Sequence, residues 1–250
     1  MFNEIIHQYS QYKNKELAWL INDYELTYEN NLKNNREQLE KYNWIDRQFT
    51  YKFNSHGFRS EEFSNDDSIM FFGCSNTVGI GLPLEDTWAY MVAQNLNLKC
   101  FNLAIGATGP DVSFRLANHY IPQIKPNIVV YAEPHPSRFA LVGVDDIYQF
   151  STHGIVSHNI ISMKYNETKK FDNFYEQWIL NEENIKLNSV KHRLAIQALC
   201  QQYNIKFAFA ESYSELAPID LDFARDLMHP GVESNKIFAE LILDRINQNN

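Results

Sequence analysis

The sequence predicts an α/β fold in which a mainly parallel sheet is covered by helices on both faces. Short apolar stretches alternate with amphipathic ones from residue 68 towards the C-terminus, as strands and covering helices do. The stretch NIVVYA (127–132) is almost continuously apolar, as expected of a parallel strand buried on both faces. Glycines and polar residues follow the apolar stretches, and an open parallel sheet gathers such residues at one edge.

The expected elements begin with a largely helical segment over residues 1–45, where apolar side chains recur at helical spacing. An extended segment around residues 49–53 follows, with alternating aromatic residues. We then expect four strands and four helices in alternation. The strands are 68–72, 99–104, 127–132 and 204–210, and the helices are 84–98, 110–126, 171–203 and 233–246.

We divide the chain into an N-terminal helical arm, residues 1–48, and a main α/β domain, residues 49–250. The arm is expected to pack on the main domain, and the alternative is an arm that forms a homo-oligomer or binds a partner. A stretch near 142–170 breaks the alternation of strands and helices. We interpret it as an insertion over one end of the sheet, either structural filler or a lid or hairpin.

Composition excludes several classes of protein. The net charge of −9 comes without a basic run, which disfavours nucleic acid as a partner. The three cysteines, Cys74, Cys100 and Cys200, are too few and too far apart for a disulfide framework or a zinc site. No signal peptide or membrane span is evident, so we expect a cytoplasmic protein. No cluster of metal-ligating residues is evident either, and we expect no metal or cofactor.

Residues capable of chemistry follow the predicted strands or precede the last helix. Ser75 follows the first strand of the main domain, and a glycine loop containing Gly106 follows the second. Asp226 and His229 stand shortly before the last helix. Each motif alone is weak, because Gly-x-Ser after a strand is usually only a turn. Their order along the chain, and the shared edge of a parallel sheet, predict that they meet.

A serine hydroxyl attacks a carbonyl only when a base takes its proton and donors stabilise the oxyanion. His229 is the best candidate base. Asp226, three residues earlier, can accept from one imidazole nitrogen and leave the other to face Ser75. Glycine at position 106 would allow its bare backbone amide to approach the substrate oxygen closely.

These motifs resemble those of the SGNH (GDSL-type) hydrolase family over about residues 50–246. Gly73-Cys74-Ser75 stands where the family has Gly-Asp-Ser, and the Asp-x-x-His-Pro block corresponds to DLMHP, residues 226–230. Three further stretches resemble other conserved segments of the family. These are an Asn-x-x-Gly-Phe-Arg motif before the first strand, the glycine loop with the start of the following helix, and the family's second sequence block, which supplies the oxyanion glycine. They are FNSHGFRSEEF (53–63), NTVGIGLPLEDTWAYMV (76–92) and NLAIGATG (102–109).

The resemblance implies a flavodoxin-like three-layer α/β/α sandwich and a serine esterase that cleaves or transfers a small O-acyl group such as acetyl. It implies a triad of Ser75, His229 and Asp226 and an oxyanion hole formed by the amides of Ser75 and Gly106. The implied substrate is a small acyl ester, with an acylated carbohydrate as one example. We add four residues that would shape the substrate pocket: Asn76, Glu133, His135 and Arg138.

The chain departs from the family pattern at two positions. Cys74 replaces an aspartate of mostly structural role, and we expect its side chain to point into the sheet. The third block normally supplies an asparagine that donates to the oxyanion, whereas the matching position here falls near Pro136. One such donor contributes roughly a hundred- to a thousandfold in rate. Either His135, Ser137 or Arg138 donates to the oxyanion in place of that asparagine, or the backbone amides of Ser75 and Gly106 suffice to stabilise it.

The alternative to an esterase is a catalytically weakened protein that kept the fold and binds a carbohydrate or another ligand. The missing asparagine motivates this alternative. A phosphate-binding role for the glycine loop is disfavoured, because no Gly-Lys-Ser/Thr run is present and the glycines do not fit a dinucleotide-binding fingerprint.

Overall fold

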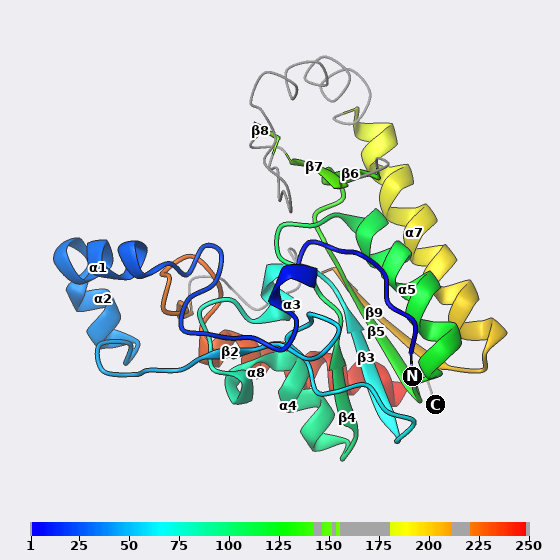
Figure 1. Ribbon diagram of the computed structural model, residues 1–250, viewed down its shortest axis with the longest axis horizontal. Coiled ribbons are helices and arrows are strands. Elements are labelled where there is room, and N and C mark those ends of the chain that lie inside the picture. Colours follow the sequence, from blue (N-terminus) through cyan, green and yellow to red (C-terminus); the bar gives the residue numbers. More distant parts are fainter. Residues whose placement is uncertain (1, 143–146, 152–153, 156–180, 212–220, 249–250) are drawn as a thin grey trace.

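The centre of the molecule is a four-stranded parallel sheet (Figure 1). The computed structural model describes residues 2–142, 147–151, 154–155, 181–211 and 221–248. The strands lie in the order β4-β3-β5-β9, which is the order 2-1-3-4 of flavodoxin-like sheets. Their bounds are β3 (Ser68–Phe72), β4 (Lys99–Asn102), β5 (Ile128–Glu133) and β9 (Lys206–Glu211).

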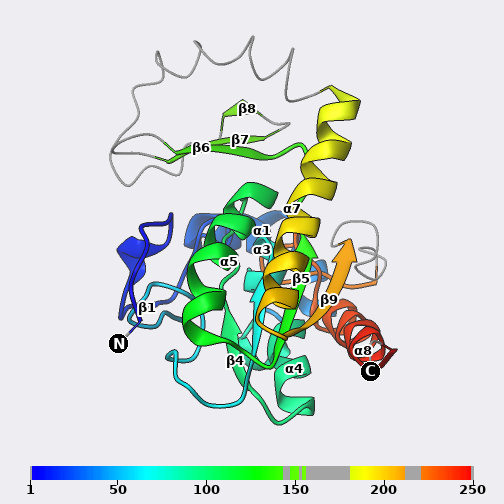
Figure 2. The same cartoon turned by 90° about the vertical axis from the view of Figure 1, so that its right-hand side faces the viewer.

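Helices cover both faces of this sheet, which confirms the predicted three-layer sandwich (Figures 1 and 2). One face packs against α5 (Pro110–Ile124) and α7 (Glu182–Gln202). The opposite face packs against α4 (Trp88–Asn95) and α8 (Val232–Gln248). Strand β3 is buried along its whole length because it lies between two other strands and between two helical layers.

Alternate side chains of β3 enter the two halves of the core. Phe71 packs edge-to-face against Trp88, and Trp88 packs in the same way against Phe238 of α8. Met70 and Phe72 point to the other face and join the cluster that contains Leu116 and Ile196. This alternation fixes the register of the strand and therefore the position of the residues that follow it.

The N-terminal segment is less helical than its sequence predicts. It contains a 3-10 turn (η1, Ser10–Tyr12), a short strand β1 (Glu16–Leu17), and two helices, α1 (Glu25–Asn34) and α2 (Arg36–Lys41). Asn14 and Asn22 adopt positive φ angles of 55° and 74°, which end any regular helix between them. The helical spacing of apolar residues before position 24 therefore reflects an extended chain that packs on the domain.

Strand β1 pairs antiparallel with β2 (Tyr51–Lys52), so the N-terminal segment is joined to the start of the main domain by backbone hydrogen bonds. Two short elements follow β3: α3 (Ser75–Val78) and the 3-10 turn η2 (Leu84–Asp86).

Part of the predicted insertion folds as antiparallel strands. They are β6 (Phe139–Val142), β7 (Ile147–Ser151) and β8 (Gly154–Ile155), in that order in one sheet. The remainder of the insertion and residues 171–180 of the predicted long helix lie outside the described residues.

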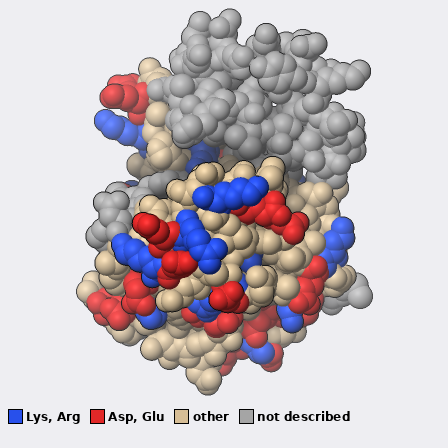
Figure 3. Space-filling model, turned by 90° about the vertical axis from the view of Figure 1, so that its left-hand side faces the viewer, with Lys and Arg blue, Asp and Glu red and all other residues tan. Residues whose placement is uncertain are grey.

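None of the described helices is both long enough and apolar enough to cross a membrane. On the face of the molecule drawn in Figure 3, acidic and basic side chains are interspersed rather than separated into regions of one sign. This face therefore presents no broad basic surface of the kind that nucleic-acid binding needs.

Candidate active site

Ser75 stands at the carboxyl end of the central strand β3, as the first residue of α3. The turn between them needs glycine at position 73, because a Cβ there would lie 2.1 Å from Oγ1 of Thr77. Ser75 is 6% exposed, and neither its hydroxyl nor its backbone N–H has a hydrogen-bond partner among the described residues. Cys74 is fully buried, as a packing residue is.

Arg59, from the stretch that resembles the Asn-x-x-Gly-Phe-Arg approach, holds α3 and the loop after it. Its guanidinium donates to the carbonyl oxygens of Val78, Gly79 and Leu82 at 2.6–3.1 Å. It also stacks 4.5 Å from the ring centre of Tyr51. Burial lowers the pKa of Arg59 to about 10, so the side chain stays charged at neutral pH and its donors remain available.

The loop after β4 brings Gly106 next to Ser75. The Asn102 side chain donates to the Thr77 carbonyl oxygen at 2.6 Å and accepts from the Ala104 N–H at 3.1 Å, which joins this loop to α3. A Cβ on Gly106 would lie 3.8 Å from Cβ of Ser75 and only 2.7 Å from the Tyr9 hydroxyl. The sequence-predicted oxyanion glycine and the predicted nucleophile are therefore neighbours.

Asp226 and His229 form a compact turn just before α8. Oδ1 of Asp226 accepts from the backbone N–H groups of Met228 and His229, each at 3.0 Å, and Oδ2 lies 2.5 Å from Nδ1 of His229. Asp226 is buried, whereas the His229 side chain is 12% exposed. Leu227 between them has a φ of 56°, a left-handed conformation that costs a non-glycine residue about 1–2 kcal/mol. The surrounding hydrogen bonds hold this strained turn.

The Asp226 turn contacts the loop that begins at Ser75. The backbone N–H of Arg225 donates to the Gly81 carbonyl at 3.0 Å. A Cβ on Gly81 would lie 3.3 Å from Oδ1 of Asp226. Segments that are far apart in the sequence therefore meet through Gly81, and no hydrogen bond joins Ser75 to His229 among the described residues.

The N-terminal segment braces the same turn through a buried ion pair. Arg225 donates to both carboxylate oxygens of Asp23 at 2.6 and 3.1 Å, and both side chains are 1% exposed. Its guanidinium lies 4.1 and 3.9 Å from the ring centres of Trp19 and Phe49. Tyr51 donates to the same aspartate at 2.5 Å and accepts from the Gly81 N–H at 2.8 Å.

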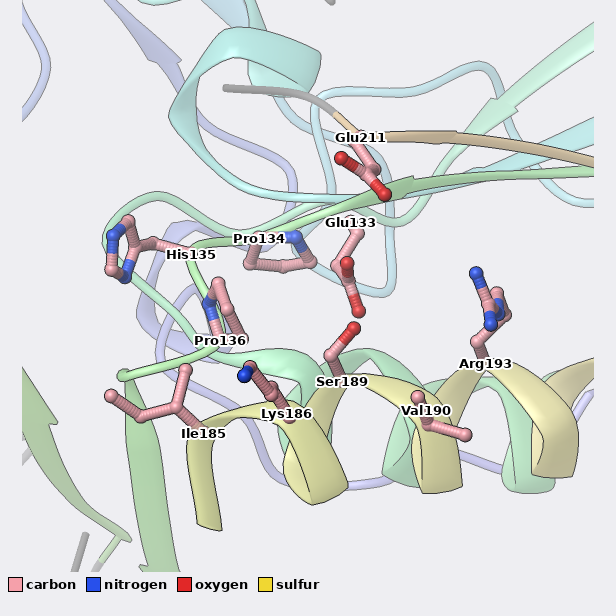
Figure 4. Close-up of a pocket in the computed structure, with 10 residues that line it drawn as sticks. All are labelled: Glu133, Pro134, His135, Pro136, Ile185, Lys186, Ser189, Val190, Arg193 and Glu211. Atoms are coloured by element: carbon pink, nitrogen blue, oxygen red, sulfur yellow. The ribbon is translucent and has the colours of Figure 1, made fainter. Parts of the chain in front are cut away.

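The third block, after β5, lines a cavity and also packs against the loop that contains Gly106. A cavity of about 440 Å³ lies between α7 and the carboxyl ends of β5 and β9 (Figure 4). Of the four predicted pocket residues, Glu133 and His135 line it, and Asn76 and Arg138 do not. Pro136 also lines it and has no side-chain donor to replace the family's asparagine.

Glu133 is the most unusual group in this cavity. It is 6% exposed, its Oε1 has no hydrogen-bond partner among the described residues, and Figure 4 shows its carboxyl group facing Ser189 of α7. Burial raises the pKa of Glu133, and this effect outweighs the hydrogen bond from Ser189 and the charge of Arg193, which both lower it. The cavity therefore offers a buried carboxyl oxygen for a ligand that donates a hydrogen bond.

Another serine and histidine pair lies beside the cavity. Nδ1 of His135 is 2.6 Å from Oγ of Ser137, which is 1% exposed. The Arg138 carbonyl oxygen packs against Gly109 and accepts from the Asn188 side chain at 3.4 Å. Among the residues that the structure describes, no group of three or more His, Cys, Asp or Glu side chains could hold a metal ion.

Sequence reasoning missed three side chains that organise the site: Tyr9, Asp23 and Arg225. Each acts across a long sequence separation, and no local pattern marks it. Arg225 directly precedes the Asp-x-x-His-Pro motif, which is the one signal that could have drawn attention to it.

No protein-family model matches the chain, and no curated protein matches it. The chain is similar to several solved structures. "TesA" has a TM-score of 0.39 and 11% identity, covering 74% of this chain and 100% of the other. The "psychrotrophic esterase EstA from Pseudoalteromonas sp." has 0.41 and 12%, covering 74% and 100%. A "family two carbohydrate esterase from Cellvibrio japonicus" has 0.36 and 12%, covering 73% and 61%.

At these TM-scores and identities, the likeness to these structures adds no argument about the family or the function of the chain. The α/β fold rests on the observed strand order and the two helical layers.

Proposed function

We propose that the chain is a serine esterase that cleaves or transfers a small O-acyl group, such as acetyl, with Ser75, His229 and Asp226 as its triad. The observation that carries the proposal is the 2.5 Å contact between Asp226 and His229, on a turn that touches the loop after Ser75. The Ser75 hydroxyl at the edge of the sheet, which has no hydrogen-bond partner among the described residues, supports it.

The proposed reaction has two steps. Oγ of Ser75 attacks the ester carbonyl carbon while Nε2 of His229 takes the serine proton. The bond between the carbonyl carbon and the alcohol oxygen then breaks, and His229 returns the proton to the leaving alcohol. Water, or an acceptor hydroxyl in a transfer reaction, attacks the acyl-serine in the same way and regenerates Ser75.

Each triad residue has a separate role in this proposal. Asp226 accepts the Nδ1 proton of His229, so the neutral imidazole presents Nε2 as a base. The same hydrogen bond stabilises the imidazolium that forms when Ser75 loses its proton. The Ser75 backbone N–H is available to donate to the oxyanion.

A second function, ligand binding without turnover, is favoured by one observation. The Gly106 N–H, which would donate to the oxyanion, already donates to the Tyr9 hydroxyl at 2.9 Å. Together with Pro136 in the third block, this leaves fewer direct backbone and amide donors than the family pattern supplies. In this reading the cavity at Glu133 would hold a carbohydrate or another ligand.

Labelling with a fluorophosphonate probe and hydrolysis of para-nitrophenyl acetate distinguish the two functions. We would compare the wild type with Ser75→Ala, and use Ser137→Ala as the matched control because Ser137 is also buried and its hydroxyl lies 2.6 Å from Nδ1 of His135. A panel of acetylated oligosaccharides then addresses the acylated carbohydrate that the family resemblance implies.

The esterase proposal expects labelling and turnover in the wild type and in Ser137→Ala, and neither in Ser75→Ala. A wild type that is folded but neither labelled nor active on the panel favours the binding function. Labelling that survives in Ser75→Ala and disappears in Ser137→Ala would move the nucleophile to the other pair.

A further inference from the structure

The N-terminal segment inserts one side chain into the candidate active site. Tyr9 is 4% exposed, and its hydroxyl accepts a hydrogen bond from the Gly106 N–H at 2.9 Å. The Cβ position of Gly106 is 2.7 Å from this hydroxyl and 3.8 Å from Cβ of Ser75. The Tyr9 hydroxyl and the proposed nucleophile therefore approach the same glycine.

The Tyr9 hydroxyl keeps a donor hydrogen that bonds to none of the described residues. A phenol can accept hydrogen bonds and donate one. Tyr9 accepts from Gly106 and donates to none of the described residues. Burial raises the pKa of Tyr9 far above the neutral range, so the group remains protonated. A buried O–H without an acceptor is costly unless a ligand atom completes it.

The backbone of Tyr9 is fixed on both sides. Its N–H donates to Nδ1 of His7 at 3.2 Å, and Nε2 of that imidazole lies 2.9 Å from the His56 carbonyl oxygen. The Tyr9 carbonyl oxygen accepts from the Tyr12 N–H at 2.8 Å and packs against Gly57, where a Cβ would lie 2.6 Å away. Gly57 has a φ of 86°, so both its conformation and this contact require glycine.

The Tyr9 ring is held as firmly as its backbone. It packs edge-to-face against Phe53 at 5.8 Å between ring centres, and its ring lies tilted against that of Tyr12 at 5.5 Å. A donor that is already in position before the reaction needs no reorganisation when charge develops. These contacts make Tyr9 a preorganised donor rather than a side chain that swings in.

We propose that Tyr9 is a catalytic residue whose O–H donates to the oxyanion in place of the third-block asparagine that this chain lacks. The inference rests on the proposed esterase function. When Oγ of Ser75 attacks, the carbonyl oxygen gains negative charge and receives hydrogen bonds from the Ser75 N–H and the Tyr9 O–H. The Gly106 N–H, bonded to the phenol oxygen, polarises the O–H and makes it a stronger donor. The phenol keeps its proton throughout.

The opposite role would be inhibitory: the Tyr9 hydroxyl would occupy the Gly106 amide, keep it from the oxyanion, and suppress activity. The two roles predict changes of opposite sign when the hydroxyl is removed. Tyr9→Phe is therefore the test, with Tyr12→Phe as the control. Tyr12 lies in the same segment, packs against the same Phe53 ring, and its hydroxyl makes no hydrogen bond to a described residue.

We expect Tyr9→Phe to lower kcat for para-nitrophenyl acetate about 10²- to 10³-fold, the usual effect of removing one oxyanion donor. KM should stay within about threefold, because the hydrogen bond strengthens in the transition state. The rate constant for phosphonylation should fall in parallel, since the phosphoryl oxygen occupies the same position. Tyr12→Phe should match the wild type in all three measurements.

An unchanged or increased kcat in folded Tyr9→Phe would overturn the inference. If the wild type is active, Ser75→Ala is inactive and Tyr9→Phe equals the wild type, only this inference fails. If the wild type shows neither labelling nor turnover, the esterase function fails and the inference fails with it.

A second measurement applies if Tyr9→Phe does not fold. Replacement of Tyr9 by 3,5-difluorotyrosine keeps the hydroxyl and makes it a stronger donor. We expect kcat to change at constant KM in that protein. An unchanged kcat would contradict a direct role for the hydroxyl.

Discussion

Both carboxylate oxygens of Asp226 contact His229. Oδ2 of Asp226 lies 2.5 Å from Nδ1 of the imidazole, and Oδ1 accepts from the His229 backbone N–H at 3.0 Å. The side chain therefore fixes both the ring and the turn that carries it. This turn also contacts Gly81, which lies in the loop that begins at Ser75.

Asp226→Asn should separate these two effects. Asparagine keeps an oxygen for the backbone N–H groups but offers an NH₂ group to the ring. His229 would then have to accept at Nδ1 and carry its proton on Nε2, where it could not receive the serine proton. We expect kcat to fall about 10⁴-fold with a thermal midpoint close to that of the wild type.

Asp222→Asn serves as the control on the same loop. Asp222 accepts from the N–H and hydroxyl of Ser234 at the start of α8, so its replacement should affect stability more than kcat. A wild-type rate in Asp226→Asn would remove Asp226 from the triad.

Arg225→Leu should destabilise the protein strongly. It would leave the carboxylate of Asp23 buried without its cation and take the guanidinium from between Trp19 and Phe49. Breaking a buried pair in this way costs about 3–5 kcal/mol in the free energy of unfolding. Arg36→Leu, which breaks an exposed pair with Glu40, should cost less than about 0.5 kcal/mol. Denaturant unfolding of both variants measures the difference, and equal losses would refute the structural role of the buried pair.

The stability of the fold should decrease as the pH falls from 6.5 towards 3, and His7 should account for part of this. Burial lowers the pKa of His7 from 6.5 to about 3 in the folded protein. The unfolded chain therefore binds a proton in this window that the folded chain excludes, which favours unfolding. Protonation would also take away the acceptor that Nδ1 offers to the Tyr9 N–H.

We expect His7→Gln to reduce the pH dependence of the unfolding free energy between pH 8 and pH 5. Some dependence should remain, because burial also lowers the pKa values of His56 and His192. His119 of α5, which is only partly buried, provides the control substitution, His119→Gln. A slope that is the same in His7→Gln and in the wild type would show that His7 is not held neutral.

Val190→Trp tests whether the cavity beside Glu133 receives part of the substrate. Val190 lines the cavity from α7, and an indole there would occupy much of its volume. We expect KM to rise at least about tenfold for esters with a large alcohol or acyl part and to change little for para-nitrophenyl acetate. Leu194→Trp is the matched control, since Leu194 lies one turn further along α7, is exposed, and does not line the cavity. Equal KM values for large and small esters in Val190→Trp would place the substrate elsewhere.

The sequence predicts the sheet well because the relevant information is local. The apolar run of β3 (Ser68–Phe72) and the polar residues after it define the strand and its exposed end within one short stretch. The meeting of the Ser75 loop and the Asp226 turn follows from a general rule about parallel sheets. Neither prediction depends on knowing a specific side-chain contact.

The N-terminal segment shows where local information ends. The helical spacing of apolar residues before position 24 indicates which side chains face the domain. The backbone there does not form a regular helix, because Asn14 and Asn22 adopt positive φ angles. The contacts from Tyr9 to Gly106 and from Asp23 to Arg225 join residues that are 97 and 202 positions apart in the sequence. No periodicity or motif encodes such pairs, so only the folded arrangement reveals them.

The central claim is that Ser75 is the nucleophile and that His229 serves it. A crystal structure of the protein after reaction with an alkyl phosphonate tests this most directly. We predict phosphorus bonded to Oγ of Ser75, with Nε2 of His229 facing the adduct and one phosphoryl oxygen within hydrogen-bond distance of the Ser75 N–H. An adduct on Ser137, or an imidazole at position 229 that points away from the phosphorus, would contradict the account.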